Sequence, residues 1–220
     1  MSERADIVII GGGVAGAALA WRLAERGATN VVLLERESTH DYHASGRSAA
    51  TLHTLIGEPA TLLLSIRSGD FFRRPPGGFA EAPLLRKTGT LVIGGGAPLA
   101  RQRLLALLAR ERGMRFEPQN LRQCVQRVPV LDLATIDEGL WCPDDGVIDI
   151  HALLRGYVRG ARARGARVRT DVAVTGIDAP GGRVRAVETT AGPIETQKVV
   201  IAAGAWANEV GAWAGADPLP

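Results

Sequence analysis

The sequence predicts an α/β fold with a parallel sheet of the dinucleotide-binding type, followed by a β-meander. Three observations support this prediction. Residues 7–35 read as an apolar strand, a glycine-rich turn, an amphipathic helix and a second apolar strand that ends in an acid. Three short segments between residues 166 and 201 alternate apolar and polar residues. Residues 199–207 are apolar and small, which is typical of a parallel core strand whose carboxyl end meets a ligand.

The first strand leads into a G-x-G-x-x-G pattern formed by Gly11, Gly13 and Gly16, and Glu35 lies 19 residues after the last glycine. Gly11 permits a tight turn, Gly13 lets the backbone approach a pyrophosphate, and Gly16 lets the helix sit close to the sheet. The helix N-terminus offers unpaired N–H groups and a partial positive charge to phosphates. Glu35 is suited to accept hydrogen bonds from ribose hydroxyls. The complete unit therefore predicts a dinucleotide site.

The same segment could be taken for a signal peptide, because the apolar run 7–20 ends in Ala18-Leu19-Ala20. It contains four glycines, follows a mixed-charge start and continues into a second strand. It is also shorter than the roughly 20 residues of a membrane helix. These features favour the dinucleotide site over export or membrane insertion.

The next part of the chain predicts a polar loop at 43–51 and a helix at 60–72, which PPGGF at 75–79 ends. Residues 88–96 read as a strand that ends in glycines and leads into a turn. They form no second nucleotide fingerprint, because Leu99 stands where the third glycine would be and no strand–acid pair follows.

A leucine-rich helix follows and ends near Gly113, with Leu104, Leu105 and Leu108 expected on one side. Residues 114–147 are mixed and turn-rich. Asp149 is a candidate N-cap for a helix at about 150–164. The predicted meander consists of Ala166–Ile177, Arg183–Thr189 and Ile194–Ile201. The chain is expected to stop after the last strand without a capping helix or return strand.

Composition indicates a globular protein. The chain has 220 residues, of which 46% are hydrophobic, and its net charge is +3. Arginines recur at 155, 159, 162, 164, 167 and 169, but no aromatic residues interleave for base stacking, which favours a solvated helix face over a nucleic-acid site. Cys124, Cys142 and the four histidines form no metal-ligand pattern, so no metal site is predicted and the cysteines are expected to be ordinary thiols.

In this order, the segments resemble the D-amino acid oxidase/dehydrogenase family of flavoproteins, the group of glycine oxidase, sarcosine oxidase and D-arginine dehydrogenase. The resemblance covers nearly the whole chain and is strongest to the D-arginine dehydrogenase branch. The segments that carry it are the fingerprint with Glu35-Arg36, HASGRSAAT (43–51), FFRRPPGGFAEAPLL (71–85), WCPDDGVIDIHALLRGY (141–157) and VVIAAGAWANEV (199–210).

The resemblance implies FAD as the cofactor and a Rossmann-like fold of the glutathione-reductase type. The turn and helix start would face the pyrophosphate, and Glu35 and Arg36 would hold the adenosine end. The 44–51 loop would run along the ribityl chain and flavin ring, and Val174 would meet the adenine with its backbone. The residues expected to bind FAD are Gly11, Gly13, Val14, Ala15, Gly16, Glu35, Arg36, Ala44, Ser45, Gly46, Arg47, Ser48, Ala49, Ala50, Thr51, Val174, Ala203, Gly204 and Trp206.

The implied reaction is oxidation of a D-amino acid to an imine, then a keto acid, with hydride transfer to flavin N5. Thr51 and Ile56 stand where the D-arginine dehydrogenase branch has a histidine and a tyrosine that face the substrate, and the neutral Thr90 replaces its acidic residue. D-arginine is therefore not the expected substrate, and no catalytic residue is assigned. His53 lies nearby, although an ordinary structural histidine is the favoured interpretation.

The resemblance implies an FAD-binding domain in two parts, 1–57 and 144–220, around a partial α+β substrate domain at 58–143. The C-terminal half of the family fold is absent, so the chain is expected to be a truncated, N-terminal part whose substrate-domain strands lack partners. Alternatives are a 2-hydroxy acid or glycerol-phosphate dehydrogenase-like enzyme, and a non-catalytic fragment or subunit of a split flavoprotein. The expected partner is a small-molecule substrate, an amino acid or a hydroxy acid, and no nucleic acid is expected. A complementing chain that supplies the missing half and a peripheral membrane contact are further expected partners. The expected location is cytoplasmic or peripheral to the inner membrane.

Overall fold

The computed structural model describes residues 3–132, 134 and 136–219, which form two compact units. The first unit combines residues 1–48 and 150–220, and the second comprises residues 49–149. The expected boundaries at residues 57 and 144 lie inside this second unit, where residues 51–52 pair with residues 146–147. Each unit is described by itself.

A four-stranded parallel sheet organises the first unit, in the order β10 (Arg167–Arg169), β3 (Val31–Leu34), β2 (Ile7–Ile10) and β14 (Val199–Ile201). The four residues of β3 are all buried, as expected for a strand that runs inside a parallel sheet. β14 follows the parallel direction that the sequence predicts, but it pairs only with β2 among the described strands and is half-buried. The predicted α/β class is confirmed.

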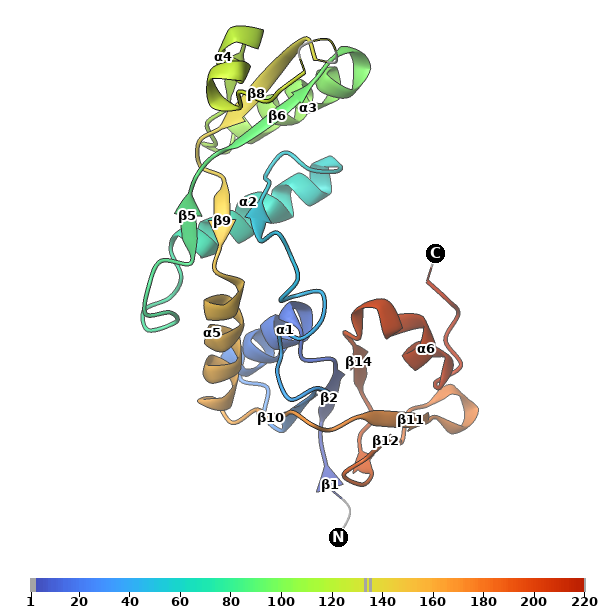
Figure 1. The fold of residues 1–220 in the computed structure, drawn as a ribbon. Helices are drawn as coiled ribbons and strands as arrows, with labels where there is room; N and C mark the ends of the chain where they lie inside the picture. The colour runs from blue at the N-terminus through green and yellow to red at the C-terminus, as the bar shows by residue number, and fades with distance from the viewer. Residues whose placement is uncertain (1–2, 133, 135, 220) are drawn as a thin grey trace. The chain divides into compact units, whose positions relative to one another are not determined.

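Helices α1 (Val14–Glu25) and α5 (Ile150–Arg162) lie side by side in this unit (Figure 1). The buried indole of Trp21 packs against the ring of Tyr157, with 5.5 Å between the ring centroids. Gly160 allows the Trp21 ring of α1 to lie close to α5, because a Cβ on Gly160 would be only 2.6 Å from Trp21 Cδ1. The helix predicted at about 150–164 is confirmed as α5, and its buried side includes Leu153, Leu154, Tyr157, Val158 and Ala161.

The predicted meander is part of a second sheet in the order β1 (Glu3–Arg4), β13 (Ile194–Glu195), β12 (Ala186–Thr189) and β11 (Val174–Asp178). The first segment assigned to it was wrong in part, because residues 167–169 pair with β3 of the parallel sheet. The end of the last segment, residues 199–201, pairs in parallel with β2, as predicted for a parallel core strand. Alternation identified the strand at 167–169 but could not indicate that it belongs to the parallel sheet.

The end of the first unit also differs from the expectation. A short 3₁₀ helix η2 (Gly204–Trp206) and helix α6 (Ala207–Ala212) follow β14. Another 3₁₀ turn, η1 (Pro180–Gly182), connects β11 and β12. Val210 of α6 is buried and joins the apolar cluster that includes Val8, Val32, Val187 and Ile194. The helix was missed because small residues give it little amphipathic pattern.

The second unit holds two three-stranded antiparallel sheets. One has the order β4 (Thr51–Leu52), β9 (Gly146–Ile148), β5 (Leu85–Lys87), and the other has β6 (Thr90–Gly94), β8 (Glu138–Cys142), β7 (Glu117–Gln119). The expectation that residues 88–96 lack strand partners was wrong for one edge, because β6 pairs with β8. Between residues 114 and 148, the described residues form β7, β8 and β9, which are too short to show a sustained alternation.

The described residues of this unit also form helices α2 (Pro59–Arg73), α3 (Gly96–Arg110) and α4 (Leu121–Arg127). Their core includes Leu62, Ile66 and Leu105. Leu104 was expected beside Leu105, but it is 59% exposed, since neighbouring residues on a helix point in different directions. Asn120 and Gln123 form a capping box at the start of α4.

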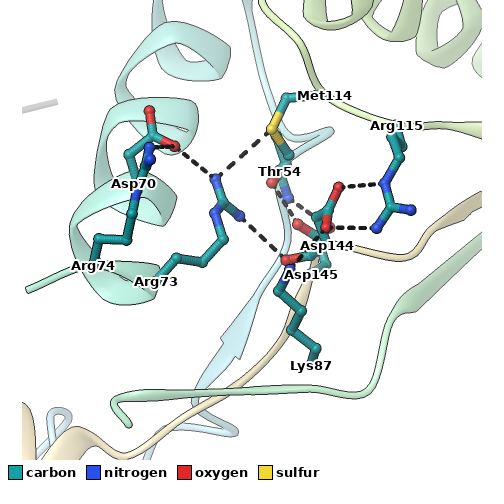
Figure 2. Close-up of polar contacts among 9 residues, drawn as sticks. All are labelled: Thr54, Asp70, Arg73, Arg74, Lys87, Met114, Arg115, Asp144 and Asp145. Atoms are coloured by element: carbon teal, nitrogen blue, oxygen red, sulfur yellow. Dashed lines mark hydrogen bonds and ion pairs between the residues drawn. The ribbon is translucent and has the colours of Figure 1, made fainter.

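A polar cluster connects the strands and loops of the second unit (Figure 2). Asp145 is fully buried and accepts hydrogen bonds from the Thr54 N–H, the Thr54 hydroxyl and the Thr90 hydroxyl. The neighbouring Asp144 pairs with Arg115 and Lys87. The turn between β8 and β9 is thereby tied to both sheets of the unit.

Candidate cofactor-binding site

The carboxyl ends of three parallel strands lie level in the first unit. Ile10 of β2 is in register with Leu34 of β3 and with Ile201 of β14. The chain segments that follow these strands, beginning with Gly11, Glu35 and Ala202, therefore meet at one edge of the sheet. A cavity of about 640 Å³ opens there. Its volume is in the range of small-molecule and cofactor sites.

Close backbone contacts explain the predicted glycines. Gly11 has a φ of +105°, and a Cβ there would collide with the carbonyl of Ala202. A Cβ on Gly16 would collide with the Gly11 carbonyl, and one on Gly13 would lie 2.9 Å from Ser45 Oγ. The turn is thus a cradle without side chains at the N-terminus of α1. This shape fits a pyrophosphate, which needs close access to backbone N–H groups.

Glu35 contacts this turn directly. Its Oε2 accepts a hydrogen bond of 2.8 Å from the Gly12 N–H, and its Oε1 accepts one of 3.0 Å from the Glu37 N–H. The carboxylate is therefore held in a fixed orientation at the end of β3, where it lines the cavity. This position fits the predicted contact with ribose hydroxyls.

His40 was missed by the sequence analysis. Its Nδ1 lies 3.0 Å from the Gly12 carbonyl oxygen, to which it donates, and its ring also lines the cavity. Burial lowers the pKa of His40, so the neutral ring predominates at pH 7. A histidine a few residues after the acid carries no sequence signal that separates it from a loop residue.

The 44–51 loop is only partly at the cavity. Ala44, Ser45 and Arg47 line it, and Ser45 Oγ accepts a 3.0 Å hydrogen bond from the Val14 N–H at the start of α1. Gly46 allows the loop backbone to pack closely on residue Asp41, because a Cβ on Gly46 would collide with the Asp41 carbonyl. Gly16, Gly46 and Ser48 do not line the cavity, and Ala49, Ala50 and Thr51 belong to the second unit, so their cofactor contacts stay predictions.

The other predicted residues gather at the cavity with several that were not predicted. The predicted ones that line it are Gly11, Gly13, Val14, Ala15, Glu35, Arg36, Ala44, Ser45, Arg47, Val174, Ala203, Gly204 and Trp206. Tyr42, His43 and Trp213 also line it. The guanidinium of Arg36 lies over the indole of Trp206, with 4.0 Å from Arg36 Cζ to the ring centroid.

The candidate substrate residues lie in the second unit. Thr90 donates its hydroxyl to Asp145 Oδ2 at 2.8 Å, so this side chain is held by a structural carboxylate. His53 Nε2 is buried without a hydrogen-bond partner among the residues that the structure describes. In the same described part of the chain, no group of three or more potential ligands could hold a metal, and no helix is long and apolar enough to cross a membrane.

The fold and cavity define a dinucleotide-binding protein of the Rossmann type. Residues 6–220 match the family described as "DAO: FAD dependent oxidoreductase". The chain therefore belongs to this family of FAD-dependent oxidoreductases, which confirms the predicted family and its cofactor.

Individual relatives support the assignment. The chain is 32% identical to the mitochondrial dimethylglycine dehydrogenase of Homo sapiens, over 95% of this chain and 24% of that protein. It is also 32% identical to the mitochondrial sarcosine dehydrogenase of Mus musculus, over 98% of this chain and 24% of that protein. The chain thus spans about a quarter of the length of these relatives.

Solved structures show the same fold. The L-proline dehydrogenase of P. horikoshii superimposes with a TM-score of 0.84 at 24% identity, over 98% of this chain and 57% of that chain. The L-amino acid deaminase of Proteus myxofaciens gives a TM-score of 0.82 at 25% identity, over 100% of this chain and 50% of that chain.

Proposed function

We propose that this chain binds FAD in the cavity of the first unit and serves an enzyme that oxidises an amino acid at its C–N bond. The observation that carries the proposal is the glycine cradle beside Glu35 at the carboxyl edge of the parallel sheet. The family match supports FAD as the dinucleotide. Two relatives are named as dehydrogenases of dimethylglycine and of sarcosine, which supports an amino acid as the substrate class.

The residues of this chain would hold FAD along the cavity. Backbone N–H groups at the start of α1 would bind the pyrophosphate, beside those of Gly12 and Val14, which donate to Glu35 and Ser45. Glu35 would accept hydrogen bonds from the ribose hydroxyls. The Val174 backbone would meet the adenine, and residues 44–51 with Ala203, Gly204 and Trp206 would flank the rest of the cofactor. The flavin itself supplies the chemistry, which is acceptance of a hydride from the substrate carbon that bears the amine.

We propose a D-amino acid, oxidised to an imine that water hydrolyses to a keto acid, as the first substrate to examine. The resemblance to the D-arginine dehydrogenase branch supports this choice. Thr90 is neutral and donates its hydroxyl to Asp145, which argues against a substrate with a strongly basic side chain. The named relatives include enzymes of N-methylated glycines and of L-amino acids, so the stereochemistry has to be decided by experiment.

The visible absorption spectrum of the purified, desalted 220-residue chain tests the cofactor site. A flavin band at near-stoichiometric occupancy is the expected result. A colourless chain, even after refolding with added FAD, contradicts the proposal for this chain.

An anaerobic bleaching screen of the flavin-loaded chain then tests the substrate class. The panel contains D-amino acids, L-amino acids, N-methylated glycines and 2-hydroxy acids. Bleaching by D-amino acids alone supports the full proposal, and bleaching by 2-hydroxy acids supports the alternative enzyme. A loaded chain that no compound bleaches supports the non-catalytic subunit.

A further inference from the structure

The glycine-rich turn contains a glycine that the G-x-G-x-x-G pattern does not require. Gly12 occupies the first variable position of the pattern, between Gly11 and Gly13. A Cβ on Gly12 would collide with Nδ1 of His40 and would lie 2.8 Å from the Cβ of Glu35. A glycine is therefore needed at this position because two side chains from the segment after β3 pack directly on the turn.

These two side chains hold the backbone of Gly12 from both directions. The Gly12 N–H donates to Glu35 Oε2 at 2.8 Å, and the Gly12 carbonyl accepts a hydrogen bond from His40 Nδ1 at 3.0 Å. The peptide between Gly12 and Gly13 is trans, so its carbonyl and its N–H point in opposite directions. By fixing the Gly12 carbonyl, His40 also fixes the direction of the Gly13 N–H.

The Gly13 N–H is the donor that this arrangement leaves free. The Gly12 N–H before it is occupied by Glu35, and the Val14 N–H after it donates to Ser45 Oγ at 3.0 Å. Within the part of the chain that the structure describes, the Gly13 N–H makes no hydrogen bond. Gly13 also lines the cavity. A free backbone N–H at a helix start is suited to bind an anionic oxygen.

The His40 ring is placed to respond to an anion in the cavity, because it is partly buried and lines the cavity wall. Burial lowers the pKa of His40, and the positive charge of Arg162 on α5 acts in the same direction. The Gly12 carbonyl and the carboxylates of Glu35 and Asp41 partly offset this decrease. The ring is therefore mostly neutral at pH 7, and a bound anion would favour its protonation.

We propose, building on the proposed function, that His40 is a positioning residue for the pyrophosphate of FAD. Its hydrogen bond to the Gly12 carbonyl directs the Gly13 N–H toward the phosphate oxygens. A protonated ring keeps the Nδ1–H donor and carries its second proton on Nε2, so the contact persists while a positive charge is added beside the cavity. His40 thus acts on the phosphates and not on the adenosine.

The test measures the binding of FAD, ADP and adenosine to the full 220-residue chain by calorimetry at pH 8. His40→Phe keeps a flat ring but removes the donor. We expect it to weaken FAD and ADP binding about fivefold, the effect of losing one hydrogen bond, and to leave adenosine binding unchanged. His40→Asn keeps an N–H donor near the position of Nδ1, so its FAD affinity should stay within about twofold of the wild type.

The pH dependence separates an action on the phosphates from a purely structural contact. Between pH 8 and about 5.5, where histidines titrate, the FAD affinity of the wild type should rise about threefold relative to that of His40→Asn. The reason is that only the histidine gains a positive charge beside the phosphates. This comparison holds even if His40→Phe does not fold, and an equal pH profile in the two proteins overturns the inference.

His151→Phe is the matched control. His151 Nδ1 lies 2.9 Å from Oδ2 of Asp41, the residue next to His40, but His151 does not line the cavity. We expect unchanged FAD and ADP binding in this variant. The inference is also overturned if His40→Phe binds ADP as tightly as the wild type, or if His151→Phe weakens ADP binding equally. A wild-type chain that binds neither ADP nor FAD overturns the proposed function together with the inference.

Discussion

Thr54 and Asp145 lie 91 residues apart in the sequence and form a two-point contact inside the second unit (Figure 2). The Thr54 N–H donates to Asp145 Oδ2 at 3.0 Å, and the Thr54 hydroxyl donates to Oδ1 at 2.5 Å. Both residues are fully buried. The Thr90 hydroxyl adds a third donor at 2.8 Å. A buried carboxylate can be stable with such partners, because hydrogen bonds to a charged acceptor are strong.

Replacement of Asp145 by alanine should destabilise the chain by about 3 kcal/mol or more, because two buried donors of Thr54 and the part-buried hydroxyl of Thr90 lose their acceptor at once. Asp144→Ala is the neighbouring control. Its partners Lys87 and Arg115 are 52% and 64% exposed, so about 1 kcal/mol is expected. Urea unfolding midpoints of the two variants measure the difference. Equal losses would show that Asp145 is not the structural centre of the cluster.

Asp144 should govern part of the acid sensitivity of the chain. Hydrogen bonds from Arg115, then from Lys87, lower the pKa of this carboxyl from its ordinary 3.8 to about 2. Because the folded pKa is below the unfolded one, the stabilisation is complete above about pH 4 and is lost as the pH falls through about 2. Asp144→Asn should flatten the decrease in stability between these values. Urea unfolding as a function of pH measures it, and an unchanged slope would contradict the assignment.

Gly160→Ala should destabilise the first unit, although alanine is the better helix former by about 1 kcal/mol. The added Cβ would lie 2.6 Å from Cδ1 of Trp21, which is only 2% exposed and cannot move aside easily. Overpacking of this kind costs about 1–3 kcal/mol and should exceed the gain in helix propensity.

The same substitution in a Trp21→Phe background tests the cause. The smaller ring leaves room for the methyl group, so the added cost of Gly160→Ala should largely disappear there. An undiminished cost in the double variant, again by urea unfolding, would indicate a different origin.

The sequence predicted the first unit well because its strands and turns follow strong local rules. The glycine turn, Glu35 and α1 need only short-range patterns. The contact of Ser45 with Val14 and the stack of Arg36 on Trp206 depend on tertiary placement, which no spacing rule supplies. The second unit was less predictable, since β7 and β9 have three residues each and its buried Asp145 looks like an ordinary turn acid.

Alanine substitutions at two glycines of the first unit distinguish the cost of backbone strain from the cost of a steric collision at the cofactor site. Gly11 and Gly27 both have positive φ, +105° and +81°, but only a Cβ on Gly11 would collide with another segment, the Ala202 carbonyl. Gly27→Ala should therefore cost only the strain of a left-handed backbone, about 1 kcal/mol, and should leave FAD binding intact.

Gly11→Ala should cost more than Gly27→Ala and should also reduce FAD binding. The collision must push β14 away from the glycine turn, and the cavity is built from the segments that follow these two strands. Urea unfolding gives the stability of each variant, and titration with FAD gives its affinity. If Gly11→Ala bound FAD like the wild type, the close approach of Gly11 to Ala202 would serve the fold alone, and the cradle would have to be placed elsewhere along the sheet edge.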